Sequence, residues 1–199
     1  MSKTAIKFWQ SKPLNQFVLN QDGSFTLVSL VTLGVIGAML HQHLRLGLNL
    51  PGHHGLEWMA LLLLGRCQSQ HRWAATMVAV GAITSSLGQN ALFASVLSLK
   101  AIIFYALNGL LLDTLFRIAP RNLPLAFKAV LLGGLTYMIK PLLLIPVVAL
   151  FELKIGSFVK HGYLFPLMTH FVFGTIGALC GLAMVNAMDR IKQNTHIKR

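Results

Sequence analysis

Residues 24–44 read SFTLVSLVTLGVIGAMLHQHL and hold no Asp, Glu, Lys or Arg. A second uncharged stretch, residues 73–99, is longer still. About 20 apolar residues are enough for a helix to cross the hydrocarbon core of a bilayer. Backbone groups in lipid must be hydrogen-bonded within their own segment, and neither run alternates polar with apolar residues, so helices are favoured over a barrel. These stretches predict an all-α membrane protein.

The composition of the whole chain agrees with this class. Of its 199 residues, 55% are hydrophobic and 11% are charged, whereas a soluble domain carries about 25% charged residues. The net charge of +12 does not indicate nucleic-acid binding, because the basic residues lie between apolar runs instead of forming one surface. The lipid bilayer is therefore the expected partner, and nucleic acid is not.

Six candidate spans follow from the apolar runs, and most of the 17 Lys and Arg residues lie on one side of them. If both termini are cytoplasmic, that side is the inside, as the positive-inside rule expects. We therefore predict a compact bundle of six transmembrane helices in a bacterial inner membrane. The candidate spans are residues 24–44, 56–65, 73–92, 99–116, 125–150 and 163–188.

The second candidate span is too short to cross by itself. Either its helix begins near Pro51, or the segment enters the membrane at a tilt from a structured outer loop. Three regions are expected in the chain: a cytoplasmic or interfacial lead (1–23) without a cleavable signal, the transmembrane domain (24–189), and a basic cytoplasmic tail (190–199). The two cysteines, Cys67 and Cys180, are expected to be free thiols.

Polar side chains inside a membrane are costly, so each one predicts a function or an interior cavity. Lys140 precedes Pro141 within an apolar run, and a broken helix beside a lysine suits an anion or a polar ligand. The alternative for Lys140 and for Lys100 is snorkelling to the outer interface. The predicted ligand-binding residues, most of them toward the outer face, are Arg45, His53, His54, Glu57, Gln89, Asn90, Lys100, Asn108, Lys140 and His170.

A metal site is one interpretation of the sequence PGHHGLE at residues 51–57. If this stretch is helical, His53 and Glu57 lie four apart on one face, although Gly55 weakens a helix and no third ligand is assigned. Loop histidines with interfacial hydrogen bonds are the alternative. His41 and His43 are a weaker metal-binding pair, because residues two apart diverge on a helix.

Other polar residues have structural explanations. Asn108 and His170 could bond to neighbouring helices instead of to a ligand. Asp113 is four residues before Arg117 and is expected to pair with it. Gly34 and Ala38 have the small-xxx-small spacing of closely packed helices, which suits either packing within the bundle or docking of a separate membrane subunit.

No catalytic motif is present. The sequence has no Walker motif, no Gly-x-Ser-x-Gly, no His-Glu-x-x-His, and only five acidic residues. We therefore expect neither an enzyme nor a resident cofactor, and the chain carries no ATPase of its own.

The first span contains Gly34-Val-Ile-Gly37-Ala38, its exit reads Leu48-Asn49-Leu50-Pro51, and the last span carries glycines at 174, 177 and 181. With six short spans, this organisation over residues 24–188 resembles the substrate-binding S components of energy-coupling factor transporters. Their usual Ala-x-x-x-Ala appears here only as Gly34-x-x-x-Ala38.

The resemblance implies binding of a vitamin-like micronutrient or a metal ion in an outward pocket. It also implies a membrane coupling subunit, docked at Gly34 and Ala38 and driven by cytosolic ATPases. Because basic and imidazole groups outnumber acidic ones in that region, an anionic or hydrogen-bonding molecule is expected over a free cation. The alternatives are a membrane enzyme or a haem- or metal-binding anchor subunit, and a structural protein without a ligand.

Overall fold

The computed structural model describes residues 23–43, 50–93, 99–120, 122–151, 158 and 162–197. Within these ranges the chain is helical and contains no strand, so the predicted all-α class is confirmed for them. The lead at 1–22 and Arg45 lie outside the described residues. The helices are α2 (Gly23–His43), α3 (Gly55–Gln68), α4 (Ala74–Phe93), α5 (Leu99–Ile118), α6 (Leu125–Tyr137), α7 (Ile139–Phe151) and α9 (Leu164–Ile197).

Four segments are long and apolar enough to cross a membrane: Gly23–His41, Lys100–Ile118, Leu125–Phe151 and Leu164–Ile191. They coincide with four of the six predicted spans, so a multi-pass helical membrane protein is the class that the structure supports. The last helix continues to Ile197, through most of the expected tail.

The other two predicted spans are not among these four. At 1.5 Å per residue, the 14-residue α3 is about 21 Å long, shorter than a hydrocarbon core of about 30 Å. Helix α4 has 20 residues, but hydroxyl and amide side chains make it more polar than its lack of charge suggested. Those side chains are Thr76, Thr84, Ser85, Ser86, Gln89 and Asn90.

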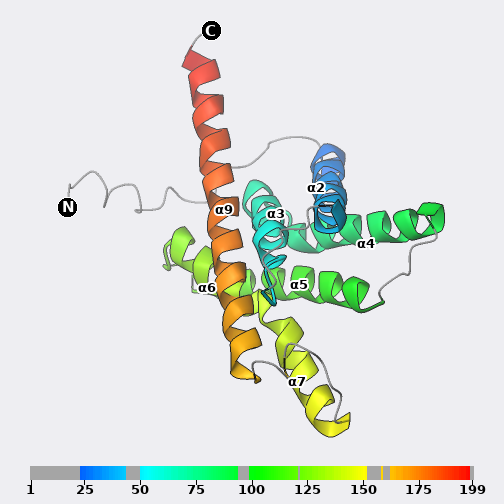
Figure 1. The fold of residues 1–199 in the computed structure, drawn as a ribbon. Helices are drawn as coiled ribbons and strands as arrows, with labels where there is room; N and C mark the ends of the chain where they lie inside the picture. Colours follow the sequence, from blue (N-terminus) through cyan, green and yellow to red (C-terminus); the bar gives the residue numbers. More distant parts are fainter. Residues whose placement is uncertain are drawn as a thin grey trace.

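The helices cross steeply instead of running all in one direction. Figure 1 shows α4 and α5 lying alongside each other, across the long axis of α9. Helix α3 packs on α9, and α2 packs on α4. The compact bundle of six transmembrane helices therefore stays a prediction, while the contacts place α3 in the middle of the fold.

Glycines allow these helices to approach closely. A side chain at Gly34 would collide with the backbone of α4 at Val78, and one at Gly81 would collide with the backbone of α2. Gly177 and Gly181 likewise meet the backbone of α3. The small residues identified in the sequence thus build contacts within the chain.

The apolar run from Leu125 to Phe151 is divided at Met138, two residues before Lys140. Pro141 has no N–H to donate to the preceding turn, which removes one helical hydrogen bond. Figure 1 shows that α6 and α7 point in different directions. The predicted break in this run is present.

Buried charge at the C-terminal end of α3 holds three helices together. Asp113 of α5 is completely buried, and its carboxylate accepts hydrogen bonds from the N–H groups of Ala75 (3.1 Å) and Thr76 (2.8 Å) and from the Thr76 hydroxyl (2.8 Å). It also forms an ion pair with Arg66 of α3 at 3.4 Å. The first N–H groups of a helix lack partners within the helix, so Asp113 caps α4 from a neighbouring helix.

The predicted pair of Asp113 with Arg117 is wrong. The Arg117 guanidinium lies over the Trp73 ring, 4.5 Å from its centroid. Asp113 faces inward toward α3 and α4, whereas Arg117 is exposed. The spacing of residues along α5 could not reveal that the Asp113 carboxylate caps the first turn of α4.

Candidate ligand-binding site

The turn at residues 51–54 carries the paired histidines, and Gly52 within it and Gly55 directly after it let the chain pack closely against α6 and α9. Gly52 has φ of +86°, a conformation that glycine adopts without strain. A Cβ there would approach the His170 ring at 2.8 Å, and a Cβ on Gly55 would collide with the Tyr137 ring. The turn closes through a hydrogen bond from the Gly55 N–H to the Gly52 carbonyl, 2.9 Å.

A stacked pair of rings supports this turn from below. Tyr137 of α6 and His170 of α9 lie with centroids 5.2 Å apart and planes 24° from parallel. The buried His170 donates through Nδ1 to the Pro166 carbonyl at 2.7 Å. The His170 ring therefore lies directly against Gly52 of the turn, and its hydrogen bond stays within α9. Its role in binding a ligand stays a prediction.

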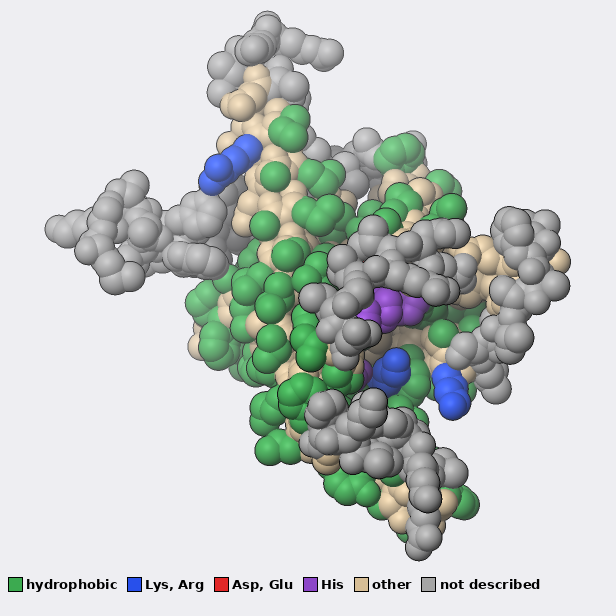
Figure 2. Space-filling view, in the orientation of Figure 1, with side chains coloured by type: hydrophobic (Ala, Val, Ile, Leu, Met, Phe, Trp, Pro, Cys, Tyr) green, Lys and Arg blue, Asp and Glu red, His purple; other side chains and the backbone are tan. Residues whose placement is uncertain are grey.

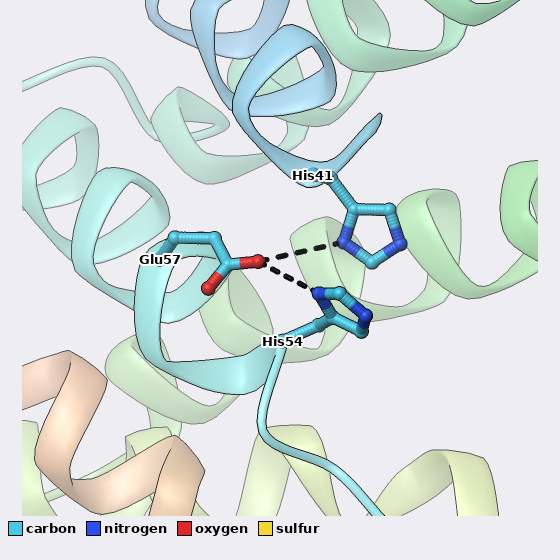
Figure 3. Close-up of side chains that lie close together, drawn as sticks. All are labelled: His41, His54 and Glu57. Carbon is cyan, nitrogen blue, oxygen red and sulfur yellow. Dashed lines mark hydrogen bonds and ion pairs between the residues drawn. The ribbon is translucent and has the colours of Figure 1, made fainter. Parts of the chain in front are cut away.

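Above the turn, three side chains from two helix ends and the turn converge, as Figure 3 shows. The Glu57 carboxylate, in the first turn of α3, accepts a hydrogen bond at Oε1 from Nδ1 of His54, 2.9 Å away. Nδ1 of His41, in the last turn of α2, lies 3.9 Å from the same oxygen. The three ligand-type atoms all lie within 4.8 Å of one another. We call these residues the His–His–Glu cluster.

Within the cluster the glutamate is buried and the two histidines are partly exposed. The Glu57 side chain is 6% exposed, whereas those of His41 and His54 are 33% and 31% exposed. Among the described residues, Oε2 of Glu57 and Nδ1 of His41 are buried without a hydrogen-bond partner. Buried polar atoms without partners cost free energy, so this arrangement has unused capacity to bind.

Aromatic rings border the cluster. His41 meets the edge of Tyr105 with centroids 6.0 Å apart, and Tyr105 packs on the buried Trp58 at 4.6 Å. The His53 ring lies 4.0 Å from that of His54, and its Nδ1 donates to the Leu50 carbonyl at 2.7 Å. Figure 2 shows histidine side chains reaching the surface on this face, with Lys or Arg side chains nearby.

The two lysines expected at the site are both exposed. Lys140 has its Nζ 5.7 Å from the centroid of Phe104. Lys100 is exposed at the start of α5. Neither is among the three clustered side chains.

The predicted amide residues bond elsewhere. Gln89 donates to the Ser85 hydroxyl at 2.9 Å, and Asn90 donates to the Ser86 carbonyl at 2.7 Å, both within α4. Asn108 is buried in α5, and its Oδ1 has no partner in the part of the chain that the structure describes. None of the three belongs to the His–His–Glu cluster.

The residues expected to dock a partner face the chain's own helices. Gly34 lies against the backbone of α4, and Ala38 is completely buried. This placement favours internal packing, the other interpretation of their spacing. Docking of a separate subunit at these residues stays a prediction.

The sequence named both histidines of the motif and paired His53 with Glu57 in its metal interpretation. In the structure His54, three residues before Glu57, meets the carboxylate, whereas His53 bonds to the loop. The sequence interpretation also discounted His41, because His43 diverges from it on the helix. The position of His41 was a useful signal. It lies at the end of α2, and only a short stretch of sequence separates it from the motif at 51–57, so the two could be expected to lie close together.

Comparison of the chain with protein-family models, curated proteins and solved structures finds no match.

Proposed function

We propose that this chain is the solute-binding membrane subunit of a micronutrient uptake transporter of the energy-coupling factor type, in a bacterial inner membrane. The observation that carries the proposal is the His–His–Glu cluster. It places a buried carboxylate with an unused oxygen beside two partly exposed imidazoles in a multi-pass helical membrane protein. Such a group is expected where a membrane protein handles a polar solute.

The support from chain organisation is separate from the site. The chain resembles the S components in its short helical spans and in its glycine-patterned last helix, and it has no sequence motif for ATP hydrolysis. Energy for uptake then comes from a membrane coupling subunit and cytosolic ATPases supplied by other chains.

A haem-binding anchor subunit is the alternative from another class. Two histidines on facing helices are the usual requirement for bis-histidine haem ligation. Among the described histidines, His170 supports the turn and bonds to Pro166, and His41 and His54 lie beside each other at one end of α2 and α3. The placement of the histidines favours a small solute over a haem.

The test is purification of the tagged full chain from the membranes of its own host, followed by native mass spectrometry. Co-purification of a membrane subunit with ATPases, and loss of uptake of one nutrient in a deletion strain, are the expected results. A chain that purifies alone, from a host whose nutrient and metal contents do not change on deletion, would refute the transporter assignment.

A further inference from the structure

We propose that His41, His54 and Glu57 bind one divalent transition-metal ion of the Zn²⁺, Co²⁺ or Ni²⁺ type. This inference names the solute class and in that respect rests on the proposed function, although the binding itself can be measured without transport. It departs from the sequence-based expectation of an anionic or hydrogen-bonding molecule, because the clustered groups differ from those that the sequence placed together.

The spacing of the donor atoms fits a single ion. Ligand atoms about 2.0–2.2 Å from Zn²⁺ at a tetrahedral angle are about 3.3 Å apart. The distances from Glu57 Oε1 to Nδ1 of His54 and of His41, 2.9 and 3.9 Å, fall on either side of this value. All three donor atoms lie within 4.8 Å of one another, so side-chain rotations that draw the two imidazoles together around the carboxylate would complete the site.

The unpartnered atoms point to the same ligand. Nδ1 of His41 and Oε2 of Glu57 have no hydrogen-bond partner among the described residues, although both atoms are buried. A proton shared between His54 and Glu57 satisfies only one bond of the cluster. A cation would use His41 Nδ1 as a ligand and would neutralise a carboxylate that is 6% exposed.

The donor types select the class of ion. Imidazole nitrogen suits Zn²⁺, Co²⁺, Ni²⁺ and Cu²⁺, whereas Ca²⁺ and Mg²⁺ take oxygen ligands. Three protein ligands leave a coordination position open, as in sites that exchange water or substrate. An open position and two partly exposed histidines suit an ion that must be released.

The nearby Lys140 opposes a cation by charge repulsion, but its geometry limits the effect. Its side chain is exposed and its Nζ lies over the Phe104 ring. An anionic fourth ligand, such as hydroxide or a small carboxylate, would compensate the positive charge of the ion and of Lys140 together. Replacement of Lys140 by Met is therefore expected to strengthen metal binding.

The test is calorimetric titration of Zn²⁺ into the metal-free, full-length chain in detergent, purified without a polyhistidine tag. The expected result is one ion per chain in the unmutated protein. Replacing an outer hydrogen-bond partner of a metal ligand weakens binding by about 10- to 100-fold, so His41→Gln, His54→Gln and Glu57→Gln should each weaken it at least that much. The matched control is His71→Gln, an exposed histidine at the opposite end of α3, which should leave affinity unchanged.

A variant that fails to fold would not decide the question, so the unmutated chain is also measured. X-ray absorption of the Zn²⁺-loaded protein should show a first coordination sphere of nitrogen and oxygen with two imidazoles. Absence of stoichiometric binding, binding retained in all three variants, or a sphere with one imidazole or none would overturn the metal site.

The two proposals can fail separately. Stoichiometric Zn²⁺ binding in a host where deletion changes no metal content would retain the site and overturn metal as the transported solute. Uptake of an organic nutrient that depends on this chain, without Zn²⁺ binding, would retain the transporter and overturn the metal site.

Discussion

The two ends of α3 each hold a buried carboxylate next to basic groups, yet they differ in what those carboxylates lack. At the C-terminal end, both oxygens of Asp113 have partners: the α4 N–H groups, the Thr76 hydroxyl and Arg66. At the N-terminal end, Oε2 of Glu57 has none among the described residues. A fully bonded buried charge fixes the fold, whereas a partly bonded one is available for a ligand.

The largest expected effect is at the C-terminal end of α3, where both oxygens of the carboxylate have partners. Asp113→Ala leaves the half-buried Arg66 without its carboxylate and uncaps α4. The expected cost is at the low end of the about 3–5 kcal/mol that breaking a buried ion pair takes from the free energy of unfolding. The measurement is the thermal unfolding midpoint in detergent, with Asp113→Asn as the milder variant that keeps one oxygen acceptor. If the unfolding midpoint of Asp113→Ala equals that of the unmutated protein, Asp113 does not stabilise this end of α3 and the contrast between the two ends is wrong.

A smaller effect is expected where the turn rests on His170. Gly52→Ala places a side chain at φ of +86° and 2.8 Å from the His170 ring, and the left-handed conformation alone costs about 1–2 kcal/mol. The matched control is Gly162→Ala, with φ of +69° but no described atom within 4 Å of the added Cβ. Gly52→Ala should lower both the unfolding midpoint and Zn²⁺ affinity, and Gly162→Ala should lower the midpoint less and leave affinity intact. Equal effects on affinity would show that the turn does not position the cluster.

Glu57→Gln should change stability least among these replacements. The amide oxygen can still accept from His54, and Oε2 has no partner to lose in the part of the chain that the structure describes, so the cost should be about 1 kcal/mol or less. The expected outcome is a nearly unchanged unfolding midpoint together with lost Zn²⁺ binding. A midpoint drop as large as that of Asp113→Ala would assign Glu57 a structural role.

Cys67, at the C-terminal end of α3, should also be inert to thiol reagents. Burial raises the pKa of the Cys67 thiol to about 12, so at pH 7.5 the reactive thiolate is essentially absent. In a Cys180→Ser variant, Cys67 should stay unmodified by a water-soluble maleimide and react once dodecyl sulfate unfolds the chain. Raising the pH toward 12 should increase the rate. Equal rates in the folded and unfolded chain would show that this end admits water.

Much of the fold could be predicted from local sequence. The apolar runs predicted all the spans that the structure supports, and the proline at 141 predicted the interruption between α6 and α7. The span expected at 73–92 was predicted from its lack of charge alone. The many hydroxyl and amide groups of α4 keep it out of the four segments that are apolar enough to cross a membrane. The shortness of α3 was visible in the sequence.

The candidate site was only partly predictable. The motif at 51–57 could be identified because two histidines between glycines, followed by a glutamate, are unusual in an apolar chain. Their grouping could not, because it depends on where α2 ends relative to α3. Asp113 shows the same limit: spacing suggested Arg117, whereas the carboxylate serves α4 and Arg66.

The sequence by itself determined the membrane class, the helical segments and the residue types available for chemistry, because apolar run length and backbone hydrogen bonding act locally along the chain. Only the tertiary structure decided which polar groups meet. Helix crossings set by glycine contacts bring His41 to His54 and Glu57, and Asp113 to the first turn of α4, and these contacts join residues that no sequence period relates.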